Sequence, residues 1–160
     1  MEFEIKPADI ILVSGTGKIS KLIEEIENSK FSHSAIYVKN NELIEAEGIR
    51  KVGYQVLDYY DERATVFRCD ILTNKQRNKI VEYVIKTIGY HYDFRLLFLE
   101  LISYLFDILI PYKGDKDSRI CSTLVVDAYR SVGVDLCLGI GYPSPKDVSE
   151  SELLRVVGTY

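Results

Sequence analysis

The sequence predicts an α+β fold in which an antiparallel β-sheet packs against helices. Short strand-like runs lie mainly in residues 9–71, and two of them carry a hairpin signal. Runs with helical periodicity dominate residues 73–132. Strands and helices that are segregated along the chain favour an α+β domain. A chain of 160 residues can bury one sizeable core, so we expect residues 1–160 to form a single domain.

The predicted sheet begins with the apolar run Asp9–Gly15. A short amphipathic helix should follow, because apolar residues recur there at helical spacing: Ile19, Leu22, Ile23 and Ile26. The other strand-like runs are residues 33–38, 42–46, 52–57 and 64–71. The first two are joined by Lys-Asn-Asn at residues 39–41, which predicts a β-hairpin.

Three helices are predicted after the strands. Thr73 can cap the first, and Gly89 would end it. The second covers the strongly apolar stretch 94–112 and forms a helical insert. The third starts near Cys121 and ends at Gly133. Its apolar face consists of Leu124, Val125, Ala128 and Val132.

Composition and charge narrow the class of protein. Hydrophobic residues make up 47% of the chain and charged residues 28%, as in ordinary globular domains. A net charge of −4 without a basic cluster argues against nucleic-acid binding. Three widely spaced cysteines without a C-x-x-C pair predict neither a disulfide framework nor a zinc site. The charged N-terminal sequence MEFEIKPADI does not resemble a signal peptide, so we expect a reducing, cytoplasmic location.

The apolar stretch 94–112 is long enough to suggest a membrane span. It also contains Arg95, Glu100 and Asp107. Because a charge near the centre of a bilayer costs about 2.5–3.5 kcal/mol, we expect a mostly buried helix and no transmembrane segment. Contact of residues 96–110 with lipid, with an acyl chain or with a second copy of the chain is the alternative.

The sequence VSGTGKIS, residues 13–20, superficially resembles a phosphate-binding loop. That motif, G-x-x-x-x-G-K-[ST], requires a glycine where this chain has Leu12 and a hydroxyl residue where it has Ile19. We therefore predict an ordinary turn.

Cys121 is the candidate nucleophile. It falls in the first turn of its predicted helix, where free N–H groups favour a thiolate and could bind an oxyanion. Cys69 would lie within a strand and Cys137 in a loop. A buried, unreactive core cysteine is the alternative. A catalytic role also requires a base and a third group that orients the base.

His33 is the candidate base, and the hairpin supplies the third group. If residues 39–41 form a three-residue loop, Ala35 pairs with Glu45. Glu45 and Glu47 then share the face of His33, with Glu47 opposite it and Glu45 diagonal to it. A two-residue loop would turn both glutamates to the other face. Two glutamates on a solvated strand face are the alternative.

The segments around these candidates resemble a known group of enzymes. SHSAIYVKNNELIEA (32–46) resembles the histidine-bearing hairpin of NlpC-type amidases and of the lecithin–retinol acyltransferase family. RICSTLVVDAYRSVGV (119–134) resembles their cysteine-bearing helix. The histidine precedes the cysteine here, which is the signature of circularly permuted papain-like proteins. KPADIILVSG (6–15) and GYHYDF (89–94) are similar to the YiiX-like branch of amidases and peptidases.

This resemblance implies a permuted papain-like, NlpC-type fold and a cysteine amidase or peptidase that acts through a thioester. It implies that Cys121 is the nucleophile, that His33 is the general base and that Glu45 orients His33, with Glu47 as the alternative. Tyr37 is a candidate oxyanion donor, in addition to the backbone N–H of Cys121. The implied chemistry needs no metal and no cofactor.

The resemblance leaves the substrate open. NlpC-type relatives suggest a peptide or cell-wall amide, and the acyltransferase relatives suggest a fatty amide or lipid acyl group. We expect a small amide, peptide or lipid as partner, no nucleic acid, and at most membrane contact; the oligomeric state is not predicted. Access to a cell wall would require lysis, phage delivery or an unusual export route. An inert papain-like binding module is the alternative from another class, because a fold can be kept without its activity.

Overall fold

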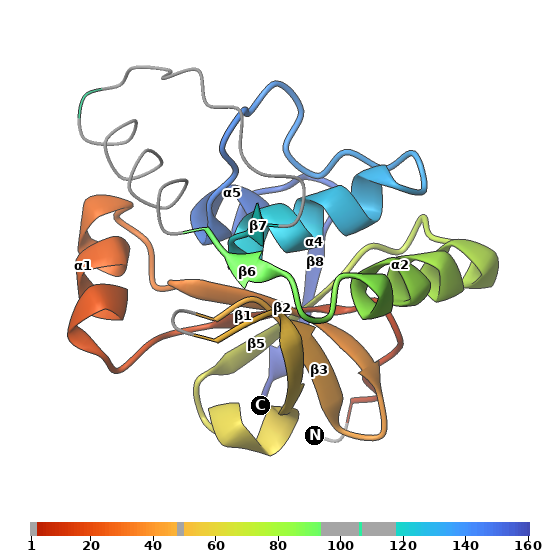
Figure 1. Ribbon diagram of the computed structural model, residues 1–160, viewed down its shortest axis with the longest axis horizontal. Helices are drawn as coiled ribbons and strands as arrows, with labels where there is room; N and C mark the ends of the chain where they lie inside the picture. Colours follow the sequence, from red (N-terminus) through yellow and green to blue (C-terminus); the bar gives the residue numbers. More distant parts are fainter. Residues whose placement is uncertain (1–2, 48–49, 94–105, 107–117) are drawn as a thin grey trace.

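The computed structural model describes residues 3–47, 50–93, 106 and 118–160 (Figure 1). Its main sheet has six antiparallel strands in the order β4-β3-β2-β1-β5-β8. These strands are β1 (Ile10–Val13), β2 (His33–Lys39), β3 (Glu42–Glu45), β4 (Gly53–Val56), β5 (Ala64–Arg68) and β8 (Arg155–Thr159). A small parallel pair consists of β6 (His91–Tyr92) and β7 (Ser118–Arg119). The helices are α1 (Lys18–Ile26), α2 (Asn74–Lys86), α4 (Cys121–Arg130), α5 (Pro145–Ser149) and the 3₁₀ turn η1 (Leu57–Tyr60).

The predicted α+β class and antiparallel sheet are confirmed. Helices α2 and α4 lie over one face of the sheet (Figure 1). Alternate residues of β1 point to opposite faces, so Ile10 and Leu12 belong to the core beneath these helices. Ile11 and Val13 belong to a second cluster, which η1 covers with Tyr60 and its neighbours. Strand β1 is therefore buried on both faces and forms the centre of the fold.

Strands β2 and β3 form the predicted hairpin in the predicted register, but through a different turn. Ala35 pairs with Glu45 as expected. The turn holds two residues, Asn40 and Asn41, with φ of 50° and 66°, which suits a type I′ turn. Val38 is an extra residue on β2 that forms a β-bulge. The expectation that a two-residue loop would turn Glu45 away from His33 is wrong, because the bulge restores the alternation.

The segment at residues 13–20 is a turn and the start of a helix, as predicted. The backbone N–H of Gly15 donates to Glu24 Oε1 at 2.8 Å and to Ser32 Oγ at 3.0 Å. A Cβ atom at Gly15 would lie 2.1 Å from the Cβ of Ser20. The glycine therefore allows the loop to lie against α1.

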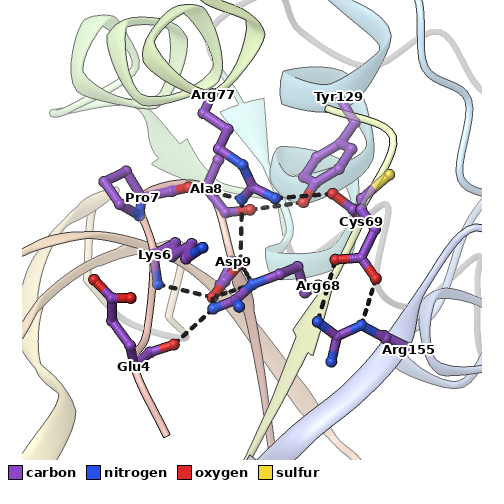
Figure 2. Close-up of polar contacts among 11 residues, drawn as sticks. Glu4, Lys6, Pro7, Ala8, Asp9, Arg68, Cys69, Arg77, Tyr129 and Arg155 are labelled. Atoms are coloured by element: carbon purple, nitrogen blue, oxygen red, sulfur yellow. Dashed lines mark hydrogen bonds and ion pairs between the residues drawn. The ribbon is translucent and has the colours of Figure 1, made fainter. Parts of the chain in front are cut away.

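Ala8 and Asp9, just before β1, tie that strand to three other elements (Figure 2). The fully buried carboxylate of Asp9 accepts from Arg68 Nε of β5 at 2.9 Å and from Arg77 Nη1 of α2 at 3.2 Å. The Tyr129 hydroxyl of α4 donates to the neighbouring carbonyl of Ala8 at 2.6 Å. Because charged groups lose their hydration when buried, this network needs all its partners, and it fixes α2 and α4 over the sheet.

The helix predicted over residues 94–112 lies outside the described residues, apart from Phe106. Phe106 is helical and exposed. In the described part of the chain, no helix has the length and apolar character needed to span a bilayer.

Candidate active site

The ends of three elements meet at the candidate site. His33 is the first residue of β2, Glu45 is the last residue of β3, and Cys121 is the first residue of α4. Because α4 packs on β2, the first turn of the helix lies close to the start of the strand (Figure 1). Cys121 and Glu45 are buried, and His33 is partly buried. The structure thus brings together the three side chains that the sequence singled out.

Glu45 holds His33 from the neighbouring strand. Its Oε2 lies 2.9 Å from His33 Nε2 and also accepts a hydrogen bond from the Tyr60 hydroxyl at 2.8 Å. The rings of His33 and Tyr60 have their centroids 5.8 Å apart. With Nε2 bound to the carboxylate, Nδ1 of His33 is left to face the thiol of Cys121.

The thiol of Cys121 and the imidazole of His33 favour each other's charged form. Burial raises the pKa of Cys121, but the hydrogen bond and charge of His33, with Ser34 beside it, reverse this and leave the pKa lowered. Burial likewise lowers the pKa of His33, but hydrogen bonds to Cys121 and Glu45 outweigh it and raise that pKa. The pair therefore favours a thiolate beside an imidazolium.

The other cysteines lie in environments that disfavour a thiolate. Both are buried. Burial raises the pKa of Cys69, and burial also raises the pKa of Cys137, to about 12. Of the three cysteines, Cys121 is therefore the one in surroundings that favour a thiolate.

The start of α4 leaves backbone N–H groups available. The N-cap residue, Ile120, has an apolar side chain that cannot accept a hydrogen bond. The backbone N–H of Ile120 itself donates to Thr123 Oγ1 at 3.1 Å. The N–H of Cys121 can thus point toward an oxygen anion that forms beside the sulfur.

Glu47 and Tyr37 occupy different places from Glu45. Glu47 Oε2 lies 3.7 Å from Arg50 Nη1, and its side chain is more than one third exposed. The Tyr37 hydroxyl accepts from the N–H of Asn41 at 3.3 Å, at the hairpin turn. Tyr37 is four residues along β2 from His33, which corresponds to about 13 Å of extended chain. The structure therefore does not place Tyr37 at the thiol.

Tyr60 is a site residue that the sequence analysis missed. It lies in η1, and its hydroxyl is bound to Glu45 in a buried contact. The sequence DYY in this segment contains no periodic pattern and no motif. Its contact with Glu45 depends on how η1 folds back over β3, which only the three-dimensional structure reveals.

A pocket of about 370 Å³ lies beside His33. Part of its wall is formed by α1 and the loop before it, and another part by tyrosines. Glu47 and Arg63 contribute charges to the lining. A second pocket, of about 480 Å³ and lined by residues from 135–153, contains none of the predicted site residues.

Residues 4–137 match the family model described as "Permuted papain-like amidase enzyme, YaeF/YiiX, C92 family". The chain belongs to this permuted papain-like family. The family prediction is confirmed, and the prediction of an amidase- or peptidase-type enzyme agrees with the family's description. A curated member, "Probable lipoprotein peptidase YaeF" of Escherichia coli (strain K12), is 27% identical. The match covers 91% of this chain and 63% of that protein, so the chain spans under two thirds of its relative.

The fold of the permuted papain-like family is also found among solved structures. The crystal structure of "metalloprotein yiiX" from Escherichia coli O157:H7 matches with a TM-score of 0.76, at 20% identity, over 99% of both chains. The predicted permuted papain-like fold is thereby confirmed. That protein is named as a metalloprotein; in the part of our chain that the structure describes, no three His, Cys, Asp or Glu side chains are grouped to hold a metal ion.

Proposed function

We propose that the chain is a cysteine amidase or peptidase in which Cys121, His33 and Glu45 form a catalytic triad. The observation that supports the proposal is the place of His33 between the other two side chains: its interaction with Cys121 lowers the pKa of that thiol, and its Nε2 lies 2.9 Å from Glu45 Oε2. A nucleophile, a base and a third group that orients the base are the parts that covalent acyl transfer requires. Membership of an amidase family supports the same reaction class.

Acylation begins with attack of the Cys121 sulfur on the carbonyl carbon of an amide. A sulfur–carbon bond forms, and the carbonyl oxygen becomes an anion that the N–H of Cys121 can bind. The proton on His33 passes to the amide nitrogen, the carbon–nitrogen bond breaks and the amine leaves. The product at this stage is a thioester on Cys121.

Deacylation reverses the role of His33. The now neutral imidazole takes a proton from water, and the oxygen attacks the thioester carbon. The sulfur–carbon bond breaks, the carboxylic acid leaves and the proton returns to the Cys121–His33 pair. One water molecule is consumed for each amide bond. Glu45 holds the ring orientation throughout, and Tyr60 fixes Glu45.

Amide hydrolysis is preferred over the other readings. The name of the relative, a probable lipoprotein peptidase, supports a peptide bond as the substrate. An inert binding module would not need a cysteine with a lowered pKa beside an oriented histidine. Transfer of a lipid acyl group would use the same thioester, with an alcohol or amine in place of water.

The test uses a panel of peptide, fatty-amide and ester substrates. Hydrolysis is measured as the release of the amine or alcohol. We expect amide turnover that Cys121→Ala abolishes, and a covalent acyl adduct on Cys121 by mass spectrometry. Cys137→Ala, which removes a buried cysteine outside the site, is the matched control. Turnover that persists in Cys121→Ala would refute the mechanism, and transfer to alcohols without amide cleavage would favour the acyltransferase.

A further inference from the structure

The pocket beside His33 carries a positive charge that the proposed triad does not use. Arg63 lines the pocket together with His33 and the tyrosines Tyr59, Tyr60 and Tyr92. The Arg63 guanidinium carbon lies 5.6 Å from the ring centroid of Tyr60 and 6.0 Å from that of Tyr59. This arginine therefore projects over the rings next to the triad.

Contacts on both sides hold Arg63 in place. Its Nη2 donates to the carbonyl of Tyr59 at 2.7 Å. Its backbone N–H donates to Tyr60 at 2.9 Å, and its carbonyl accepts from the N–H of Ser14 at 3.1 Å. A guanidinium has five N–H donors, so most of them remain for a ligand.

Arg63 has no carboxylate partner in the described residues. None of the ion pairs formed by these residues includes Arg63. The other charged residue of the lining, Glu47, pairs with Arg50. Arg63 thus makes no ion pair with the acid in the same pocket, and its guanidinium is open to a carboxylate of a ligand.

The position of the pocket indicates which half of the substrate it would bind. Its lining includes His33 but no residue of α4, the helix that carries Cys121. In acylation, His33 protonates the leaving nitrogen, so the amine half of the substrate must lie on the imidazole side. The acyl half stays on the sulfur. The pocket therefore lies where the leaving amine would be bound.

We propose that this pocket binds a carboxylate on the leaving-amine half of the substrate, with Arg63 as its partner. The inference deepens the proposed amidase function and rests on it. Arginine binds a carboxylate through two parallel hydrogen bonds, and the tyrosine rings restrict its orientation. The preferred substrates are then amides of amino acids or peptides whose free carboxylate lies close to the scissile bond.

The test compares substrates that differ only in this charge. One pair is N-octanoyl-glycine and N-octanoyl-glycinamide, and the other is acetyl-trialanine as its free acid and its C-terminal amide. The two pairs distinguish fatty amides from peptides as the source of the carboxylate. The readout is the ratio of kcat/KM for acid over amide within a pair, because a general loss of activity cancels in this ratio.

We expect the wild-type protein to favour the acid about five- to tenfold in at least one pair, the size of a partly exposed charge-assisted contact. Arg63→Gln should bring the ratio close to one, and Arg63→Lys should retain part of the preference. Arg130→Gln removes an arginine at the other end of α4 and should leave the ratio unchanged. A wild-type ratio near one, or a ratio that Arg63→Gln does not change, would overturn the inference while the amidase function stands.

A binding measurement separates failure of the inference from failure of the proposed function. If no substrate is hydrolysed, the amidase proposal fails, and the pocket is tested by calorimetry with N-octanoyl-glycine and its amide. Tighter binding of the acid that Arg63→Gln removes would support the carboxylate site. Equal binding of the two compounds would overturn it.

Discussion

At the scale of single residues, Cys121 shows how its surroundings determine whether a buried thiol is reactive. All three cysteines are buried, and burial by itself raises the pKa of each thiol. Only Cys121 also has an imidazole beside it that can carry a compensating charge. Its position at a helix start made Cys121 a candidate in the sequence. Whether burial or the neighbouring imidazole determines the pKa of the thiol could be seen only in the structure.

Alkylation of Cys121 tests this balance directly. The pKa of the Cys121 thiol is lowered, so at a given pH more of it is thiolate than for an ordinary cysteine, and iodoacetamide should react with Cys121 below about pH 8. In His33→Ala the pKa should rise, and the reaction should move to higher pH. The site of labelling is read by peptide mass spectrometry, with Cys69 and Cys137 as internal controls. Labelling of all three cysteines with one pH dependence would contradict this assignment.

Glu45 affects the ionisation of both partners in the pair. Its hydrogen bond and charge raise the pKa of His33, so Glu45→Gln should lower it. The basic limb of the kcat/KM profile, where the imidazolium loses its proton, then moves to lower pH. The acidic limb moves to higher pH, because a His33 with a lower pKa is protonated less readily and therefore stabilises the Cys121 thiolate less. We expect a narrower pH optimum and a loss of activity smaller than that of Cys121→Ala.

Glu47→Gln is the matched control for Glu45→Gln. Both residues were candidates for the third position, and Glu47 instead lies beside Arg50. The width of the pH profile should not change in Glu47→Gln. Narrowing in this variant, with a normal profile in Glu45→Gln, would assign the orienting role to Glu47.

At the scale of elements, the hairpin shows which part of the site the sequence could predict. The alternation of β2 and β3 placed Glu45 diagonal to His33, because a strand has a strict period of two residues. The choice between Glu45 and Glu47 stayed open, because alternation alone predicts both on the same face. The compensation between a two-residue turn and a bulge at Val38 could not be read from the sequence, because a bulge has no fixed residue signature.

Helix α1 gives the opposite case, in which the element was predicted but its packing was not. Helical spacing correctly placed a helix at α1. Of its apolar residues, Ile23 is buried, whereas Ile19 and Leu22 are exposed at 67% and 50%. Periodicity identifies an apolar face but does not say what that face contacts. Ile19 and Ile23 both line the pocket beside His33.

Glu27 at the end of α1 makes stability depend on pH. Burial raises its pKa to about 7, with Ser144 and Lys146 at the start of α5 hydrogen-bonded to it. The unfolded chain releases this proton near pH 4.5, so stability should fall as the pH rises from about 4.5 to 7. Glu27→Gln removes the ionisation, and it should be more stable than the wild type at pH 8 by on the order of 3 kcal/mol. Urea unfolding of both proteins at pH 5 and pH 8 measures this difference, and an equal gain at both pH values would contradict it.

At the scale of the whole molecule, the fold depends on ties between distant segments as well as on the sheet. Periodicity and caps predicted where β1 to β5 and the helices α2 and α4 lie along the chain, and the family resemblance supplied the permuted arrangement. The buried ion pairs of Asp9 could not be predicted, because Arg68 and Arg77 are about 60 and 70 residues away in the chain. Their separation means that the network forms only once β1, β5 and α2 are assembled.

Asp9→Asn tests how much this network contributes to the free energy of unfolding. It leaves the guanidinium groups of Arg68 and Arg77 without their buried carboxylate, and loss of one partner from such a pair costs about 3–5 kcal/mol. Asp70→Asn is the control, because Asp70 pairs with Arg155 at an exposed position, where an ion pair contributes about 0–1 kcal/mol. Urea unfolding followed by circular dichroism gives both values. Since Asp9 holds α2, which packs against α4, we expect the destabilised variant to lose Cys121 reactivity at lower urea concentrations than the wild type. A similar small effect of the two substitutions would show that α2 and α4 are held by apolar packing alone.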